Sequence, residues 1–191
     1  MAVNEKYILA IDLGTSGPKS AIISTGGEVV DSEFMDVPLQ LFPGGGAEQD
    51  PDDWWNAVMA TSKKVLARKL VRPGDIVAVS CTSQWSGTVP VDEHGNHLMN
   101  AIIWYDTRGA KYMKDVAGGL VNVQGMGLLK AIRWVWLTGA VPSPAGKDPF
   151  CHILYLKNEK PDIYRKTYKF LEPKDYLNLR FTGKFSASFD S

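Results

Sequence analysis

The feature that most constrains the fold is a short apolar run near the N-terminus that ends in an acid and then turns back. Tyr7–Asp12 has the apolar pattern of a strand buried on both faces, and the small residues Gly14–Pro18 follow it. Lys19–Ser24 is a second strand-like run, so the turn leads into another strand and not into a helix. The chain therefore predicts an antiparallel hairpin at its start.

This turn carries the groups that hold a magnesium-bound polyphosphate. A tight turn rich in Gly, Thr and Ser can present backbone N–H groups to an anion, and Asp12 can hold Mg²⁺ directly or through water. Lys19 can offset charge on a transferred phosphoryl group. A Walker P-loop is excluded, because Gly14 and Gly17 are too close together and Lys19 enters a strand. The structural alternative is a plain hairpin whose bend Asp12 caps.

Strand and helix patterns alternate along the rest of the chain. Glu28–Val37 is expected to be a third strand, a helix begins at Asp50-Pro51 and stops at Pro73-Gly74, and Ile76–Thr82 is again an apolar strand. Later strands are expected at Thr88–Val91, Leu98–Trp104 and Tyr168–Leu171, and later helices at Arg108–Val116, Leu128–Leu137, Pro149–Asn158 and Pro173–Arg180. Residues 43–46 and 141–146 are expected to be short flexible stretches.

This order of elements predicts an α/β fold with a mixed, five-stranded type of sheet flanked by helices. Three strands, a helix and a fourth strand, with the phosphate turn between the first two strands, are how an actin-like (ribonuclease H-like) domain begins. The last step is an analogy between folds, so function has to be argued from the site.

Composition excludes several classes of protein. The 191 residues are 45% hydrophobic and carry 21 basic and 21 acidic residues, so the basic excess of a nucleic-acid binder is missing. No apolar run approaches a membrane span, and the N-terminus lacks a signal-peptide pattern. The two cysteines, Cys81 and Cys151, suit a reducing cytosol better than a disulfide scaffold. We therefore expect a cytoplasmic protein with neither a nucleic-acid nor a membrane partner.

A second cluster of polar and aromatic residues lies beyond the strand Ile76–Thr82. The segments 83–87 and 102–108 combine Gln84, Trp85, Ser86, Trp104, Asp106 and Arg108. An indole can lie against the C–H face of a polyol, while an acid and an arginine hydrogen-bond hydroxyls or pair with each other to brace the pocket. The structural alternatives are a core aromatic for Trp104 and a helix-capping pair for Asp106 and Arg108.

Taken together, these segments resemble the N-terminal domain of the FGGY family of carbohydrate kinases, and xylulose kinases more than glycerol kinases. The resemblance covers nearly the whole chain in the right order. It rests on Asp12–Lys19, Glu48–Pro51, Trp54-Trp55, Ser83-Gln84, Ile103–Arg108, Asn158–Pro161, Ile163-Tyr164, Lys169–Leu177 and Phe181–Gly183.

The resemblance implies a role for each matching residue. The implied catalytic groups are Asp12, which would act on the Mg²⁺ and the phosphates, and the basic residue Lys19. The implied contacts to the ATP phosphates are Gly14, Thr15, Ser16 and Gly17, and the implied sugar contacts are Gln84, Trp85, Ser86, Trp104, Asp106 and Arg108. Trp85-Ser86 departs from the Arg-Glu pair of glycerol kinases and from the Met-His pair of xylulose kinases, which leaves the sugar open.

FGGY kinases have two actin-like domains, and the resemblance implies that the catalytic aspartate base belongs to the second. Residues 1–191 are then an incomplete first domain, without the second, and we expect this chain to be inactive alone. The intact protein is expected to use ATP and Mg²⁺ to phosphorylate a hydroxyl of a sugar or polyol, with a xylulose-like ketose as the favoured substrate. The sequence leaves open whether the protein forms a homodimer. The alternatives are an ATPase of the actin or Hsp70 type, which lacks the Trp-x-Asp-x-Arg segment, and a non-catalytic module that binds nucleotide or sugar.

Overall fold

The structure is a computed structural model that describes residues 5–119, 122–123, 126–139 and 143–187. The chain divides into two compact units. Unit 1 comprises Met1–Leu39, Gln49–Trp85 and Pro173–Ser191, and unit 2 comprises Gln40–Glu48 and Ser86–Glu172. The sequence predicts one domain, and the two units are described separately below.

Unit 1 is built on a four-stranded mixed sheet with the order β3-β2-β1-β6. β1 (Tyr7–Gly14) and β2 (Gly17–Ser24) form the predicted hairpin, β3 (Val29–Phe34) continues it antiparallel to β2, and β6 (Ile76–Ser83) lies parallel to β1. The predicted mixed α/β sheet is confirmed, with four strands in the described residues where the sequence indicates five.

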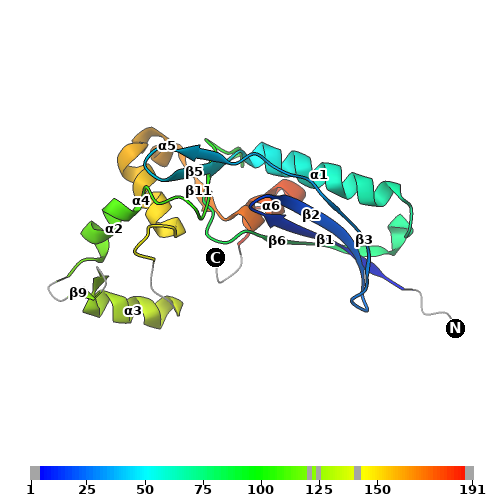
Figure 1. Cartoon of the computed structure of the whole chain (residues 1–191), viewed down its shortest axis with the longest axis horizontal. Coiled ribbons are helices and arrows are strands. Elements are labelled where there is room, and N and C mark those ends of the chain that lie inside the picture. Colours follow the sequence, from blue (N-terminus) through cyan, green and yellow to red (C-terminus); the bar gives the residue numbers. More distant parts are fainter. Residues whose placement is uncertain (1–4, 120–121, 124–125, 140–142, 188–191) are drawn as a thin grey trace. The chain divides into compact units, whose positions relative to one another are not determined.

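Helix α1 (Pro51–Ala67) lies along this sheet (Figure 1). Its start follows from the sequence, because the Asp50 side chain accepts a hydrogen bond from the Asp52 backbone N–H and Pro51 occupies the first turn. The helix buries Trp54, Ala57, Val58, Thr61, Ser62 and Val65. It ends earlier than predicted, at Ala67, and Pro73–Asp75 forms a separate short 3₁₀ turn before β6.

Helix α6 (Pro173–Thr182) returns to unit 1 and packs against β6. It also reaches the first turns of α1, where Arg180 donates to Asp52 at 2.8 Å and the rings of Phe181 and Trp55 meet edge to face. Two helices that follow different parts of the chain therefore meet beside the same sheet.

The two faces of β1 are not equally covered, which corrects the prediction of a strand buried on both faces. Leu9, Ile11 and Leu13 are buried, whereas Asp12 is exposed and Ala10 is half-buried. Ser20 of β2 pairs with Ile11 of β1, and its Oγ forms hydrogen bonds of 2.8 and 3.1 Å with the hydroxyls of Thr61 and Ser62 in α1. Helix α1 therefore covers the face of the sheet on which Ile11 lies. An apolar run in the sequence predicts a hydrophobic strand, but it does not predict which faces of that strand other elements cover.

Unit 2 contains three small sheets and four helices within the part of the chain that is described. The three-stranded sheet has the order β4-β5-β8, while β7 pairs with β11 and β9 with β10. The bounds are β4 Gln40–Phe42, β5 Gly46–Gln49, β7 Val89–Val91, β8 Ala101–Ile102, β9 Asn122–Val123, β10 Met126–Gly127, β11 Lys169–Leu171, α2 Ala110–Ala117, α3 Leu128–Thr138, α4 Pro149–Glu159 and α5 Pro161–Lys166. Gln49, the last residue of β5, is counted in unit 1.

The predicted elements of unit 2 are mostly present, with three differences. Residues 43–46, expected to be flexible, make the turn of the β4–β5 hairpin, and Gly44 and Gly45 there have φ of 81° and 86°. The expected strand Leu98–Trp104 is reduced to Ala101–Ile102, because the Asp106 backbone N–H bonds the Ile103 carbonyl and bends the chain. Helix α5 and the strands β4, β5, β9 and β10 are additions to the predicted elements.

Candidate active site

The hairpin turn of unit 1 consists of Thr15 and Ser16 between the paired residues Gly14 and Gly17. Gly17 has φ +146°, and a Cβ there would lie 1.9 Å from the carbonyl oxygen of Met35. The segment after β3 crosses against the turn at this point, and the Val37 N–H bonds the Ser16 carbonyl at 2.9 Å. Only glycine allows this approach, so the turn is held in shape from behind.

Asp12 and Lys19 lie opposite each other across β1 and β2, and Thr82 of β6 lies on the other side of Asp12. Asp12 and Lys19 are both exposed, and within the described residues neither side chain forms a hydrogen bond or an ion pair. All three residues line a depression of about 410 Å³ on the sheet, together with Ser80 and Ala21. A carboxylate, an ammonium and a hydroxyl therefore stand in a row on the open face of the sheet.

A network of buried amides holds the turn from inside unit 1. The Gln49 side chain donates to the Thr15 carbonyl at 2.8 Å and accepts from Gln84 Nε2 at 2.8 Å and from Trp54 Nε1 at 3.1 Å. The Thr15 hydroxyl bonds Gln84 Oε1 at 3.3 Å, and the Gln84 N–H bonds the Leu13 carbonyl. Gln49 is the centre of this network and is not among the predicted site residues. The sequence signals for it are its place just before the N-cap Asp50 and within the segment Glu48–Pro51, which resembles the family.

Gln84, Trp85 and Ser86 have different surroundings although they are consecutive. Gln84 is buried and its side-chain amide donates a hydrogen bond to Gln49 within unit 1, whereas Trp85 is 75% exposed. Ser86, the first residue of the second segment of unit 2, has φ +56°, and its buried Oγ has no hydrogen-bond partner among the described residues. A non-glycine residue in a left-handed conformation with an unused buried hydroxyl is a feature that occurs often at functional sites.

In unit 2, Trp104 and Tyr105 form an aromatic platform. Their rings stack with centroids 3.9 Å apart and planes inclined by 25°. The Lys147 ammonium lies 5.5 Å from the centroid of the Trp104 ring. Trp104 is half-buried and Tyr105 is exposed, so this pair is not a pure core contact.

Asp106 and Arg108 form a buried ion-pair network with Glu48. Asp106 is fully buried, and its carboxylate accepts from the Arg108 backbone N–H, from Arg108 Nε and from the Ala47 N–H at 2.8–2.9 Å. Arg108 Nη2 bonds Glu48 at 2.6 Å, and Nη1 donates to the Tyr155 hydroxyl at 3.0 Å. Desolvation alone would lower the pKa of Arg108, but its bonds to Asp106 and Glu48 outweigh this and raise the pKa.

This geometry contains the capping interaction that is the structural alternative for this pair, and also the mutual pairing that is expected to brace a pocket. Asp106 caps the following turn through its bond to the Arg108 N–H, and the two side chains also pair with each other. Glu48 and Tyr155 complete the network and are not among the predicted site residues, because they come from β5 and α4, far from Asp106 in the sequence.

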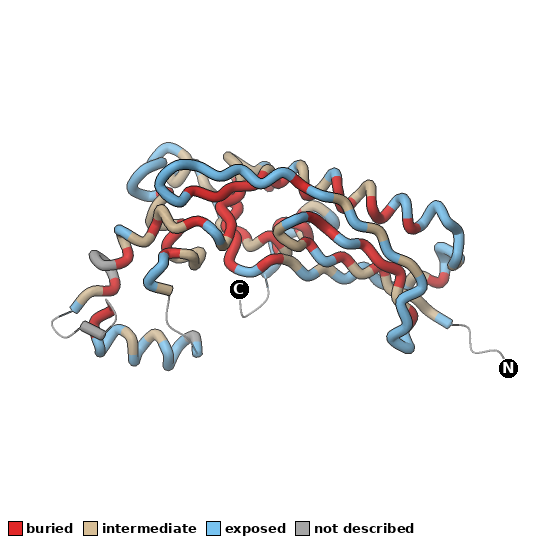
Figure 2. Tube along the Cα trace, in the orientation of Figure 1, coloured by how far each residue is buried: buried red, intermediate tan, exposed pale blue. Residues whose placement is uncertain are grey.

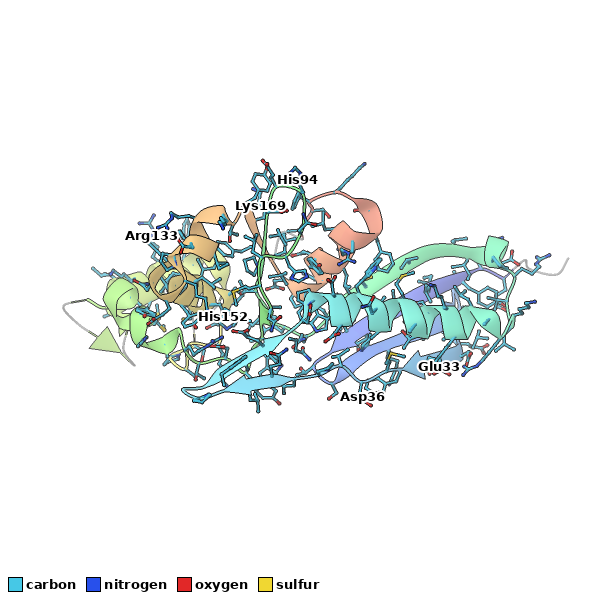
Figure 3. All side chains as sticks on the ribbon, turned by 90° about the horizontal axis from the view of Figure 1, so that it is seen from above. Glu33, Asp36, His94, Arg133, His152 and Lys169 are labelled. Atoms are coloured by element: carbon cyan, nitrogen blue, oxygen red, sulfur yellow. The ribbon has the colours of Figure 1, made fainter. Side chains whose placement is uncertain are left out.

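His152 lies on α4 in the interior of unit 2 (Figure 3), where its Nδ1 shares a 3.0 Å hydrogen bond with the Thr88 hydroxyl. Burial lowers the pKa of His152 to about 4, against a smaller opposing effect of the Asp106 charge. The imidazole is therefore neutral at physiological pH and serves to fix Thr88 at the start of β7.

The predicted site residues thus form two groups. Asp12, Gly14, Thr15, Ser16, Gly17, Lys19, Gln84 and Trp85 belong to unit 1, and Ser86, Trp104, Asp106 and Arg108 belong to unit 2. The unit 1 group combines a turn of anion-binding composition with an exposed acid and an exposed base. The unit 2 group combines an aromatic platform with a braced ion pair.

The sequence profile described as "FGGY family of carbohydrate kinases, N-terminal domain" matches residues 7–190. The chain belongs to this family. FGGY membership accounts for the order β-β-β-α-β of unit 1 and confirms the predicted actin-like kinase fold. In the described residues no helix is long and apolar enough to cross a bilayer.

Individual FGGY relatives agree with this assignment. The chain is 29% identical over 177 residues to a xylulose kinase of Staphylococcus xylosus, covering 93% of this chain and 34% of that protein. Two Lactobacillus acidophilus structures, a ligand-bound xylulose kinase and a gluconate kinase, each have a TM-score of 0.77 and 28% identity. They cover 94% and 95% of this chain, respectively, and each match takes in 34% of the solved chain. This chain therefore spans about a third of the length of these relatives.

Proposed function

We propose that this chain is the first of two domains of an ATP-dependent kinase that phosphorylates a hydroxyl of a sugar or polyol. The observation that supports it most is the exposed row of Asp12, Lys19 and Thr82 at the end of the hairpin, with the acid and the base unpaired in the described residues. The family match and the sugar kinases among the relatives support the reaction class.

The residues of the row suit a magnesium-bound triphosphate. Phosphoryl transfer depends on positioning and on stabilising the charge of the transferred group, and bound Mg²⁺ would supply most of that stabilisation. The exposed Asp12 carboxylate would hold the metal directly or through water, the Lys19 ammonium would neutralise phosphate oxygens, and the N–H groups of Gly14–Gly17 would contact the phosphates. The Gln49 network would keep this turn from moving as the ligand binds.

For the acceptor, we propose that Trp104 of unit 2 provides a flat wall for the C–H face of the sugar. We propose separately that Trp85 and Ser86 contact the sugar, as the family resemblance implies. Asp106 and Arg108 act mainly by bracing the segment that carries Trp104, since their polar atoms are bonded to Ala47, Glu48 and Tyr155. A xylulose-like ketose is the acceptor we propose first. Relatives named as xylulose and gluconate kinases match this chain equally well, so a panel of acceptors is needed.

The experiment is a coupled assay of ADP release by the full-length protein with ketoses, aldonates and polyols in turn. We expect turnover that depends on one class of sugar, on Mg²⁺ and on Asp12. ATP hydrolysis that is independent of any sugar would favour an ATPase of the actin type, and binding of nucleotide without turnover would favour a non-catalytic module. Either outcome would overturn the proposal.

We further infer a cytoplasmic location, because both cysteines are free thiols and burial raises the pKa of each. Buried thiols that are mostly protonated are poorly reactive and need no disulfide partner. Assembly as a homodimer remains a prediction from the family resemblance.

A further inference from the structure

Helix α3 in unit 2 exposes an unusual amount of apolar surface. Leu129, Ile132 and Trp136 are 83%, 58% and 81% exposed and follow one another at the spacing of a single helix face, so we call them the apolar stripe. Leu128, Val135 and Leu137 beside the stripe are exposed as well. Much of the α3 segment is accordingly pale blue in Figure 2. A helix that is apolar on its solvent side needs a partner that covers it.

The inner side of α3 is already used. Ala131 and Trp134 pack against a buried cluster of unit 2, which consists of Met113, Ala117, Met126 and Cys151. The Trp134 ring also meets Phe150 edge to face at 5.1 Å between centroids. Because these contacts fix the rotation of the helix, the apolar stripe cannot turn inward without breaking the cluster.

The charges around the stripe have one sign. Lys130 and Arg133 are the charged residues of α3, and the sequence has no acidic residue between Asp115 and Asp148 although the whole chain is balanced at 21 and 21. Lys130 Nζ bonds the Gly118 carbonyl, and Figure 3 labels Arg133 on the helix. A helix that carries exposed Leu, Ile and Trp, two cationic residues and no acid of its own is complementary to an apolar partner of negative charge.

We propose that the apolar stripe of α3 docks onto an anionic lipid surface. Short amphipathic helices with Trp and Leu on one side and Lys or Arg beside them lie in the interfacial layer of a bilayer, where anionic headgroups attract the basic residues. The indole of Trp136 suits this layer because its ring is apolar and its N–H is polar. A second copy of this chain fits less well, because pairing α3 with itself would bring two sets of Lys130 and Arg133 together without an acid.

This inference revises the sequence-based expectation of no membrane partner. That expectation follows from the lack of a run long enough to span a bilayer, and α3, with 11 residues, does not span one either. A helix that lies on the surface needs only one apolar side and leaves no apolar run of spanning length in the sequence. The catalytic proposal does not depend on it.

The test is flotation of the full-length protein with phosphatidylcholine vesicles, with and without about one third phosphatidylglycerol. We expect binding to the anionic vesicles, a blue shift of tryptophan emission, and at least tenfold weaker binding for Leu129→Gln/Trp136→Gln. Lys130→Gln/Arg133→Gln should weaken binding several-fold, as should salt at about 0.5 M. Leu41→Gln, which alters another exposed leucine of unit 2 (69% exposed), is the control and should bind normally.

Three outcomes would overturn the proposal. One is a lack of binding to either vesicle, and another is equal loss of binding in the Leu41→Gln control. The third is sedimentation that shows the chain to be a dimer which Trp136→Gln dissociates, because the stripe would then be an interface between copies. Circular dichroism of each variant shows whether α3 and unit 2 remain folded, so that a loss of binding can be assigned to the surface.

Discussion

At Gly17 the backbone conformation and a close neighbouring segment both exclude any side chain larger than hydrogen. Its φ is +146°, and the Met35 carbonyl oxygen lies only 1.9 Å from where a Cβ would stand, so Gly17→Ala forces the turn and the crossing segment apart. We expect a loss of about 2–4 kcal/mol in the free energy of unfolding. Gly74→Ala, where a Cβ would meet no atom within 4 Å, is the control and should change stability little. Urea denaturation of both variants measures the difference, and equal stabilities would contradict the close approach.

His152 should make stability depend on pH between its unfolded and folded pKa values. Burial lowers its pKa from 6.5 to about 4. Between these two values the imidazole is protonated in the unfolded chain and neutral in the folded chain. Stability should therefore fall as the pH drops through this window, by on the order of 3 kcal/mol from this residue.

The measurement is urea denaturation of the wild type and of His152→Gln from pH 7 to about pH 4. The variant should show a shallower fall, while Asp75, whose pKa the hydrogen bonds from Lys6 and Arg72 lower, contributes to the fall in both proteins. His94→Gln, at an exposed histidine, is the control variant, and its slope is compared with that of the wild type. If His152→Gln kept the wild-type slope, His152 would have an ordinary pKa in the folded state.

Among single residues, charges at strand ends can be predicted from the sequence and buried partners cannot. Asp12 and Lys19 end or begin apolar runs, and the alternation of side chains along paired strands places them together. The role of Gln49 depends on Trp54 and Gln84 reaching it in three dimensions, and no local pattern encodes that. The left-handed φ of Ser86 cannot be predicted from the sequence either, since serine does not usually adopt this conformation.

Among the elements, the segment from β8 to α2 depends on the ion pair of Arg108 with Asp106 and Glu48. Arg108→Met keeps the length of the side chain but leaves two buried carboxylates without a cation. We expect a loss of about 3–5 kcal/mol in the free energy of unfolding. Arg165→Met is the matched control, because the Arg165–Asp162 pair is exposed and should contribute about 0.5 kcal/mol or less. Similar losses in the two variants would show that the buried network is not what stabilises this segment.

The elements that the sequence predicts best are those with local start and stop signals. α1 begins at the Asp50-Pro51 cap, and β1 and β2 follow from apolar runs around a small-residue turn. The β4–β5 hairpin has no such signal, because its turn is three glycines after a proline, a composition that also suits flexible chain. Its strands are ordered by pairing with each other and with β8, which a local pattern does not report.

For the molecule as a whole, we propose that this chain carries only part of what phosphoryl transfer needs. Its match spans about a third of the length of its FGGY relatives, and we propose that the catalytic base and most of the adenosine site lie in a second domain. Transfer requires two substrates held together away from water. The 191-residue chain alone should therefore show no sugar-dependent release of ADP above a blank, in an assay where the full-length protein turns over.

Asp12 and its hairpin are proposed to hold the magnesium-bound phosphates of a sugar kinase, and every other functional role rests on this one. The decisive measurement is sugar-dependent ADP release by the full-length protein and by its Asp12→Ala variant, with unfolding curves of both. Because Asp12 is exposed and unpaired within the described residues, the variant should fold with wild-type stability to within about 0.5 kcal/mol. We expect turnover to fall about 100-fold or more in that folded variant. Turnover that survives Asp12→Ala undiminished would remove the hairpin from the mechanism.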